Sequence, residues 1–219
     1  MHNSIKNLIN IQKNIKSKLK DLKIYKIPRI IAVSKTFKID KILPLIKYGH
    51  VDFGENKVQE ALDKWNKVKL ENKNLKLHLI GRLQTNKVKF AVNLFDYIHS
   101  VDSEKLAKKI ASEALKQKKK VKIFIQVNIG NEPQKSGITK EALKYFYEFC
   151  FEINLNVVGL MCIPPADKDP SLFFEEMNIL AKELNLKELS MGMSADYIDA
   201  TEKQSTYLRI GSAIFGSRD

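Results

Sequence analysis

The chain has 219 residues, of which 44% are hydrophobic, and this suits one globular domain spanning 1–219 with a large core. No apolar run approaches the roughly 20 residues of a membrane span, and no secretory signal follows Met1, so we expect a cytoplasmic protein. The net charge of +13 comes from lysines spread along the chain while arginine is scarce, which favours a solvated surface over specific nucleic-acid binding. Cys150 and Cys162 lack metal-ligand spacing, so free thiols and no metal site are expected.

Helix-like and strand-like segments alternate along the whole sequence. Residues 4 to about 22 predict an amphipathic helix, 103–115 predict another, and further helices begin near Thr139 and at Ser171. The predicted strands are 29–34, 51–54, 76–80, 97–100, 121–127, 156–160, 188–190 and 207–210. This alternation within one domain predicts a closed (β/α)₈ TIM barrel with an extra N-terminal helix. An open doubly wound sheet is the alternative, although no G-x-G-x-x-G motif follows the first strand.

A lysine stands at the exit of the first predicted strand. The segment reads Ile30-Ile31-Ala32-Val33-Ser34-Lys35-Thr36. An amine that is partly desolvated at such a place can lose its proton and attack an aldehyde. The alternative is a lysine whose head extends into solvent at a strand end. This segment alone leaves both interpretations open.

Two loops near the end of the chain have the composition of an anion-binding site. They are Met191-Gly192-Met193-Ser194-Ala195-Asp196 and Gly211-Ser212-Ala213-Ile214-Phe215-Gly216. In a TIM barrel these loops follow strands seven and eight, where phosphate is often bound, although each alone is also compatible with an ordinary turn. Strand one neighbours strand eight, so Lys35 would lie at the same end of the barrel as these two loops. An amine and a phosphate site so close together suit an aldehyde that carries a phosphate, such as pyridoxal 5'-phosphate (PLP). Arg209 could reach its pyridine nitrogen, or form an ion pair at the rim.

Short motifs over most of the sequence carry a resemblance to a known family. They are Ala32-Val33-Ser34-Lys35-Thr36, Phe53-Gly54-Glu55-Asn56, His78-Leu79-Ile80-Gly81-Arg82-Leu83-Gln84-Thr85-Asn86-Lys87, Ser100-Val101-Asp102, Gln126-Val127-Asn128, Lys135-Ser136-Gly137, Gly159-Leu160-Met161, Ser190-Met191-Gly192-Met193-Ser194 and Arg209-Ile210-Gly211-Ser212. In this order they resemble the pyridoxal phosphate homeostasis family, single-domain relatives of the N-terminal barrel of alanine racemase.

The resemblance implies a role for each of six residues. Lys35 would hold PLP as an imine (a Schiff base), Arg209 would face the pyridine nitrogen, and Asn56 would line the ring or aldehyde side. The residues implied to bind the phosphate are Ser194, Gly211 and Ser212. Three positions depart from the commonest family pattern. Phe37 stands where a basic residue is frequent, Leu77 where Trp is common, and Ser212 where Thr is common, although Ser212 keeps the hydroxyl.

Three functions remain open at this point. The first is a protein that binds PLP and contributes to its intracellular homeostasis without turnover, with apo-enzymes as possible recipients. An arginine beside the pyridine nitrogen disfavours protonation of the ring and makes it a poor electron sink. The second is a weak amino-acid racemase, although the second domain of such enzymes is absent from this sequence. His78 is then either a base or a structural hydrogen-bonding group. The third, a nucleic-acid-binding module, rests on charge alone. We expect a monomer.

Overall fold

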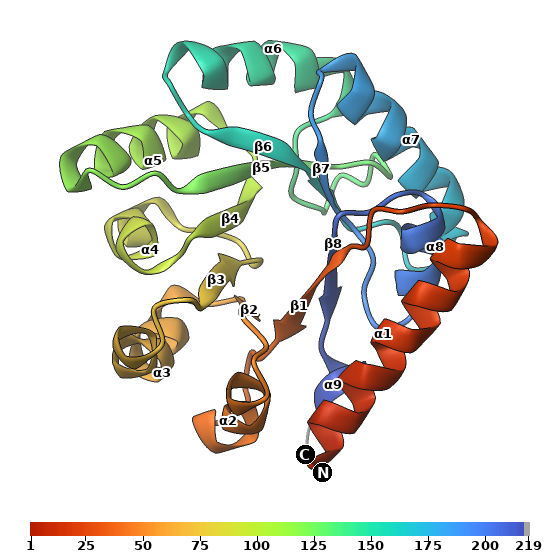
Figure 1. Ribbon diagram of the computed structural model, residues 1–219. Helices are drawn as coiled ribbons and strands as arrows, with labels where there is room; N and C mark the ends of the chain where they lie inside the picture. The colour runs from red at the N-terminus through yellow and green to blue at the C-terminus, as the bar shows by residue number, and fades with distance from the viewer. Residues whose placement is uncertain (217–219) are drawn as a thin grey trace.

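Eight parallel strands form a closed barrel in the computed structural model, which describes residues 1–216 (Figure 1). The strands are β1 Arg29–Val33, β2 Asp52–Glu55, β3 Lys76–Leu79, β4 Tyr97–Val101, β5 Lys122–Val127, β6 Val157–Cys162, β7 Glu188–Ser190 and β8 Tyr207–Ile210. They follow chain order around the barrel, and β8 pairs with β1. The predicted (β/α)₈ barrel is therefore confirmed. The last three positions of the predicted domain, 217–219, lie outside the described residues.

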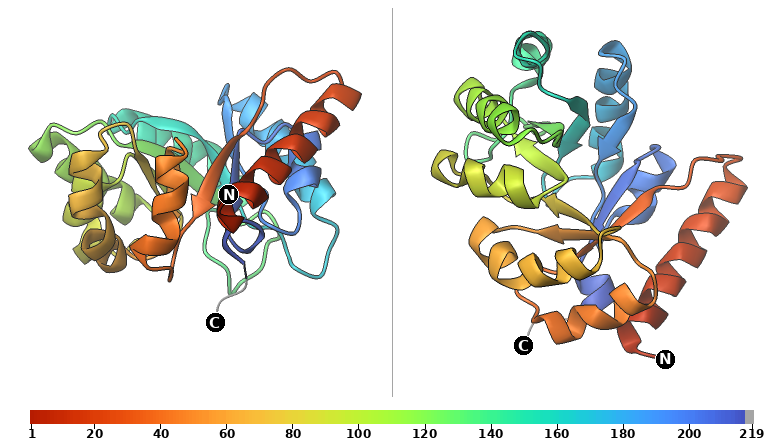
Figure 2. Two further views of the ribbon diagram at one scale, coloured as in Figure 1. Left: turned by 60° about the horizontal axis from the view of Figure 1, so that its bottom comes forward. Right: turned by 60° about the vertical axis from the view of Figure 1, so that its left-hand side comes forward.

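Helices cover the outside of the barrel (Figure 2). They are α1 Asn3–Asp21, α2 Ile39–Lys47, α3 Val58–Glu71, α4 Val88–Leu94, α5 Glu104–Gln117, α6 Lys140–Glu152, α7 Pro170–Glu183, α8 Tyr197–Glu202 and α9 Ser212–Phe215, with a 3₁₀ turn η1 at Thr85–Lys87. Side chains cap the starts of α6 and α7, because Thr139 Oγ1 accepts from the Ala142 amide and Asp169 Oδ1 accepts from the Ser171 amide. These caps explain why α6 and α7 begin where the sequence predicts.

The core has two parts, separated by the strands. The larger part lies between the strands and the helices and includes Phe53 and Trp65, both fully buried. The smaller part fills the barrel itself, with Ile31, Tyr97, Phe124, Met161 and Tyr207. The barrel interior is thus packed with side chains rather than open, so a ligand can only enter at its ends.

The predicted N-terminal helix α1 packs beside α8 and α9 (Figure 1). Its apolar stripe, which includes Leu8 and Ile15, is buried. Asn7 Nδ2 donates to the carbonyl of Ile214 at 3.0 Å, which joins α1 directly to α9. The first helix of the chain therefore supports the segment that follows the last strand.

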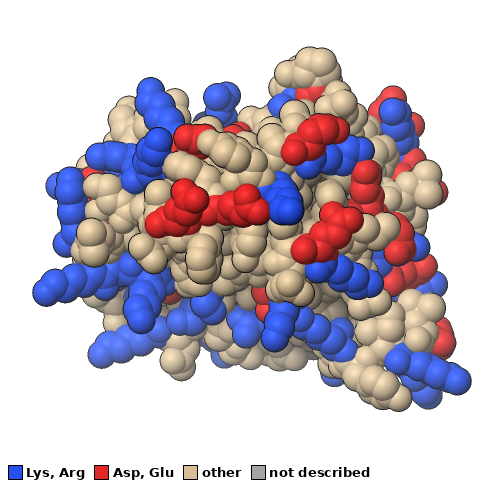
Figure 3. Space-filling view, turned by 90° about the horizontal axis from the view of Figure 1, so that it is seen from above, with Lys and Arg blue, Asp and Glu red and all other residues tan. Residues whose placement is uncertain are grey.

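Charged side chains are spread over the surface. Figure 3 shows one face, on which acidic side chains lie across the middle and basic ones along the left and lower edges. Several lysines pair with carboxylates, as Lys140 Nζ does with Glu176 Oε1 at 2.7 Å. Within the described part of the chain, no helix has the length and apolar character needed to cross a bilayer.

Candidate functional site

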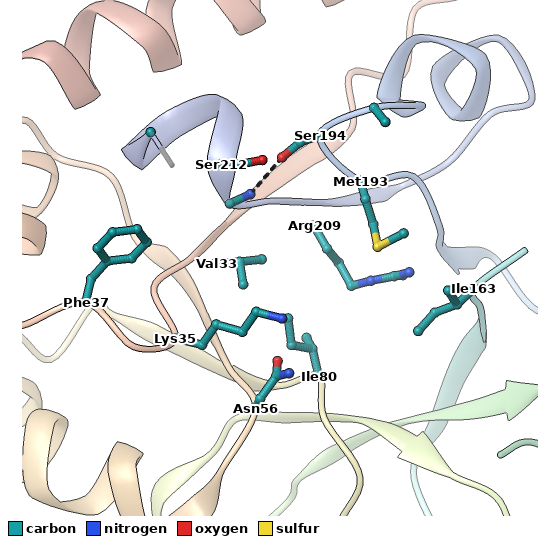
Figure 4. Close-up of a pocket in the computed structure, with 13 residues that line it drawn as sticks. Val33, Lys35, Phe37, Asn56, Ile80, Ile163, Met193, Ser194, Arg209 and Ser212 are labelled. Carbon is teal, nitrogen blue, oxygen red and sulfur yellow. Dashed lines mark hydrogen bonds between the residues drawn. The ribbon is translucent and has the colours of Figure 1, made fainter. Parts of the chain in front are cut away.

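A pocket of about 530 Å³ lies at the end of the barrel where the strands finish (Figure 4). All six residues selected from the sequence line it: Lys35, Asn56, Ser194, Arg209, Gly211 and Ser212. They come from the ends of β1, β2, β7 and β8 and from the loops that follow these strands. Parallel strands in a closed barrel all end on the same side, which is why residues so distant in sequence meet here. The volume is in the range of small-molecule sites.

The turn that carries Lys35 is held in an unfavourable backbone conformation. Thr36 has a φ of 68°, in the left-handed region that β-branched residues rarely adopt. Two side chains of α3 hold the turn: Glu60 Oε1 accepts from the Thr36 amide at 2.5 Å, and Lys64 Nζ donates to the Ser34 carbonyl at 2.8 Å. Such strain persists only where the surroundings enforce it, and α3 supplies that constraint. The side chain of Lys35 points into the pocket (Figure 4).

A buried carboxylate lies behind this turn. Glu55 is fully buried, and its Oε1 accepts hydrogen bonds from Ser34 Oγ at 2.7 Å, Lys64 Nζ at 2.9 Å and Trp65 Nε1 at 2.9 Å. The Lys64 side chain is itself only 8% exposed, so the ion pair is shielded from water. Glu55 and Lys64 together join β2, α3 and the end of β1, and they fix the position from which Lys35 extends.

The guanidinium of Arg209 lies on the pocket floor. Its NH1 donates to the carbonyl of Ser190 at 2.5 Å and to Ser190 Oγ at 2.8 Å, and NH2 donates to the carbonyl of Cys162 at 2.8 Å. Burial lowers the pKa of Arg209, but a guanidinium titrates so high that it remains a cation at neutral pH. Within residues 1–216 no carboxylate lies at ion-pair distance from it. A cation held by neutral acceptors is therefore presented to the pocket.

Ser194, in the loop between β7 and α8, lies beside the start of α9 on another side of the pocket (Figure 4). Its Oγ accepts from two backbone amides, Gly211 at 3.2 Å and Ala213 at 3.3 Å. Two N–H groups that converge on one oxygen can also serve an anionic oxygen that takes the place of the Ser194 hydroxyl. The loop depends on Gly192, whose φ is +88° and where a Cβ would lie 2.5 Å from that of Ala200.

The pocket also has apolar walls that the sequence analysis did not assign to the site. Phe37 is packed against Phe215 with ring centroids 5.0 Å apart, and Ile80, Ile163 and Met193 complete the walls. A simple rule would have found two of them, because Ile80 and Ile163 are each the first residue after a strand. Position relative to the strand end thus adds apolar residues that residue type alone does not indicate.

Comparisons with known proteins agree on one family. The family model described as "Alanine racemase, N-terminal domain" matches residues 7–219. The pyridoxal phosphate homeostasis protein of Aquifex aeolicus is 38% identical over 200 residues, with 87% of each chain covered. The chain belongs to the pyridoxal phosphate homeostasis protein family. The family resemblance predicted from the sequence motifs is thereby confirmed.

Solved structures extend this family assignment. PipY of Synechococcus elongatus PCC7942, solved without PLP, has a TM-score of 0.83 at 33% identity, and the match covers 92% of this chain and 100% of its own. PipY with PLP bound has a TM-score of 0.81 at 32% identity over 92% of this chain and 100% of its own. Alanine racemase of Clostridium difficile has a TM-score of 0.74 at 16% identity, covering 99% of this chain and 57% of its own, and it shares the fold alone.

Proposed function

We propose that this protein binds PLP as an imine on Lys35 and contributes to its intracellular homeostasis without catalytic turnover. The observation that carries the proposal is the meeting of an amine, a buried arginine and a pair of converging amides in one pocket of about 530 Å³. PipY, a relative at 32% identity, has been solved with PLP bound. Each chemical part of PLP then has a counterpart in this pocket.

The residues of the pocket match the groups of the cofactor one by one. Ser194 and the amides around its Oγ suit the phosphate, with the hydroxyl of Ser212 beside them. Arg209, a donor only, suits a pyridine nitrogen that carries no proton. Bound PLP supplies an aldehyde that amines can attack. Lys35 Nζ would add to this carbon, forming a C=N bond as water leaves, while Asn56 lines the same side of the pocket.

Two features argue for binding without turnover. The charge of Arg209 beside the ring nitrogen disfavours its protonation, which weakens the ring as an electron sink. In addition, the pocket lining, as far as the described residues form it, holds no carboxylate, imidazole or phenol that could act as a second base. His78, the base considered from the sequence, is fully buried inside the barrel and bonded to Asp52 and His99. Weak racemase activity remains the alternative function.

Absorbance spectroscopy of the purified protein tests the proposal. Protein mixed with PLP should develop an imine band, and borohydride should fix the cofactor to the peptide that contains Lys35. Lys35→Ala should abolish both signals, whereas Lys38→Ala, at an exposed lysine three positions further along, should retain them. Offered amino acids should show no exchange of the α-proton in D₂O. An imine band that survives in Lys35→Ala would refute the site, and measurable exchange would favour the racemase.

We further propose that the protein acts as a cytoplasmic monomer and passes PLP to recipient apo-enzymes. This role accords with the open mouth of the pocket at the strand ends and with the name of the relatives. Transfer should be measurable as activation of a PLP-dependent apo-enzyme by the loaded protein. Activation no faster than the release of free PLP would show that no direct transfer occurs.

A further inference from the structure

A line of polar side chains crosses the barrel interior below the pocket. Asp52 Oδ1 lies 3.0 Å from His78 Nε2, and His78 Nδ1 lies 3.0 Å from His99 Nε2. His99 Nδ1 lies 2.8 Å from Ser190 Oγ, which in turn accepts from Arg209 NH1 at 2.8 Å. The five residues belong to β2, β3, β4, β7 and β8. They join the pocket floor to the far end of the barrel, because Asp52 is the first residue of its strand and Arg209 lies near the end of its own.

Apolar and aromatic side chains isolate this chain of contacts from water. His78, His99 and Ser190 are all fully buried. The ring of His78 stacks on Tyr97 with centroids 4.3 Å apart, and that of His99 stacks on Phe124 at 4.2 Å. An unpaired polar atom would be strongly unfavourable in such surroundings, so every donor must meet an acceptor.

Only one arrangement of protons meets this requirement. A guanidinium can only donate and an ionised carboxylate can only accept, so both ends of the line are fixed. His78 must then carry its proton on Nε2 to donate to Asp52, which leaves Nδ1 as an acceptor. His99 must donate from Nε2 to His78 and accept at Nδ1 from the hydroxyl of Ser190. All four hydrogen bonds then run in the same direction, from Arg209 as the first donor to Asp52 as the last acceptor, and both imidazoles are neutral.

We propose that Asp52 is the counter-charge of Arg209, joined to it through Ser190, His99 and His78, and that this one-directional chain positions the guanidinium in the pocket. Asp52, His78, His99 and Ser190 are thus positioning residues for Arg209. The contact between Arg209 and a pyridine nitrogen rests on the proposed function. The line of hydrogen bonds from Arg209 to Asp52 does not depend on that function. The sequence gives no signal for it, since its members are scattered over 158 positions from 52 to 209.

The charges around the chain agree with this assignment. Burial works to raise the pKa of Asp52, but the hydrogen bond and charge of His78, with the charges of Arg29 and His50, bring it below its ordinary value. Burial lowers the pKa of His78 more than the bond and charge of Asp52, and the charge of Asp96, raise it.

The second imidazole is held neutral more strongly. Burial, together with the charges of His78 and Arg209, holds the pKa of His99 well below its ordinary value. Neutral imidazoles between an ionised carboxylate and a guanidinium are the state that the hydrogen-bond pattern requires.

The protein without PLP provides a direct test by ¹⁵N NMR of its histidine rings. His78 and His99 should both show the Nε2–H tautomer and should not titrate between about pH 5.5 and pH 8, where an ordinary histidine does. In Asp52→Asn the amide can donate to His78 Nε2, so the tautomer of His78 should change. In the matched variant Asp96→Asn, the altered carboxylate accepts from Lys69 Nζ and the Leu77 amide and is not hydrogen-bonded to either histidine. Loss of its charge lowers the pKa of His78 further, so both rings should stay neutral and keep the Nε2–H tautomer. An Nδ1–H or a charged ring at His99 in the unaltered protein would overturn the proposal.

A second measurement tests the effect on the pocket. Ser190→Ala removes the link between His99 and the guanidinium, and it should shift the absorbance band of bound PLP and weaken PLP binding by about tenfold or more. Ser205→Ala is the control, because this serine is equally buried but donates to the Met191 carbonyl at 2.8 Å. An unchanged band and affinity in a folded Ser190→Ala protein would overturn the positioning role. If the unaltered protein binds no PLP, the proposed function fails. The NMR experiment still tests whether the hydrogen bonds from Arg209 to Asp52 run in one direction.

Discussion

The buried ion pair behind the Lys35 turn makes a sharp prediction for Lys64→Met. The substitution keeps an unbranched apolar stem of similar length but removes three hydrogen bonds from Nζ, to the carbonyl of Ser34 and to the carboxylates of Glu55 and Glu60. The carboxylate of Glu55, fully buried, loses its cation and keeps only its bonds from Ser34 and Trp65. The turn also loses the bond that holds the Ser34 carbonyl.

The expected loss follows from the burial of both partners. Their side chains are 8% and 0% exposed, and breaking such a buried pair by removing one partner destabilises a protein by about 3–5 kcal/mol. Lys140→Met is a matched control, since its ion pair with Glu176 has similar geometry at 2.7 Å but side chains 32% and 39% exposed. An exposed pair of this kind contributes less than about 1 kcal/mol.

Urea unfolding at neutral pH, followed by circular dichroism, measures both free energies of unfolding. Lys64→Met should also weaken PLP binding, because the left-handed turn at Thr36 loses part of the support from α3, whereas Lys140→Met should bind normally. Losses of stability below about 1 kcal/mol in both variants would show that the buried pair does not stabilise the turn, and would refute the reasoning.

Two further predictions concern the phosphate-side loop and the thiols. Gly192→Ala places a methyl group 2.5 Å from Ala200 Cβ and 2.9 Å from Leu208 Cδ2. This overpacking should reduce the free energy of unfolding by about 1–3 kcal/mol and weaken PLP binding. An unaltered urea midpoint of the variant would contradict the close packing around Gly192. Burial raises the pKa of Cys150 and Cys162 from 9.0 to about 12. The unfolded chain therefore loses these protons first, and stability should fall as pH rises above 9, by about 1.4 kcal/mol per thiol between pH 8 and pH 10. A double alanine variant should lack that part of the fall, and an identical pH dependence would argue against buried neutral thiols.

The sequence predicted the fold well because its main signals are local. Short apolar runs separated by amphipathic segments define strands and helices, and only their ends moved, as where β4 continues to Val101 and β6 to Cys162. Short elements were harder. No bounds were predicted for α2, α3, α4, α8 and α9, and the last two have 6 and 4 residues, too few for a periodic pattern.

The site was partly predictable for a different reason. Lys35, Ser194 and Arg209 follow or end strands, and barrel closure brings all strand ends together whatever the details of packing. The contact between His78 and His99 depends instead on the stagger of β3 against β4 and on which side chains turn inward. Such details follow from three-dimensional packing, and periodicity in the sequence carries no information on them. For the same reason, no pattern indicated the left-handed turn at Thr36.

The pairing of β1 with β8 has a consequence for biosynthesis. β1 leaves the ribosome before its partner Tyr207–Ile210, which is made some 170 residues later. Throughout that interval the nascent chain carries an exposed, apolar strand edge, a feature that promotes aggregation. Ring closure and completion of the ligand pocket thus wait for the synthesis of β8, so a product interrupted before β8 would lack both.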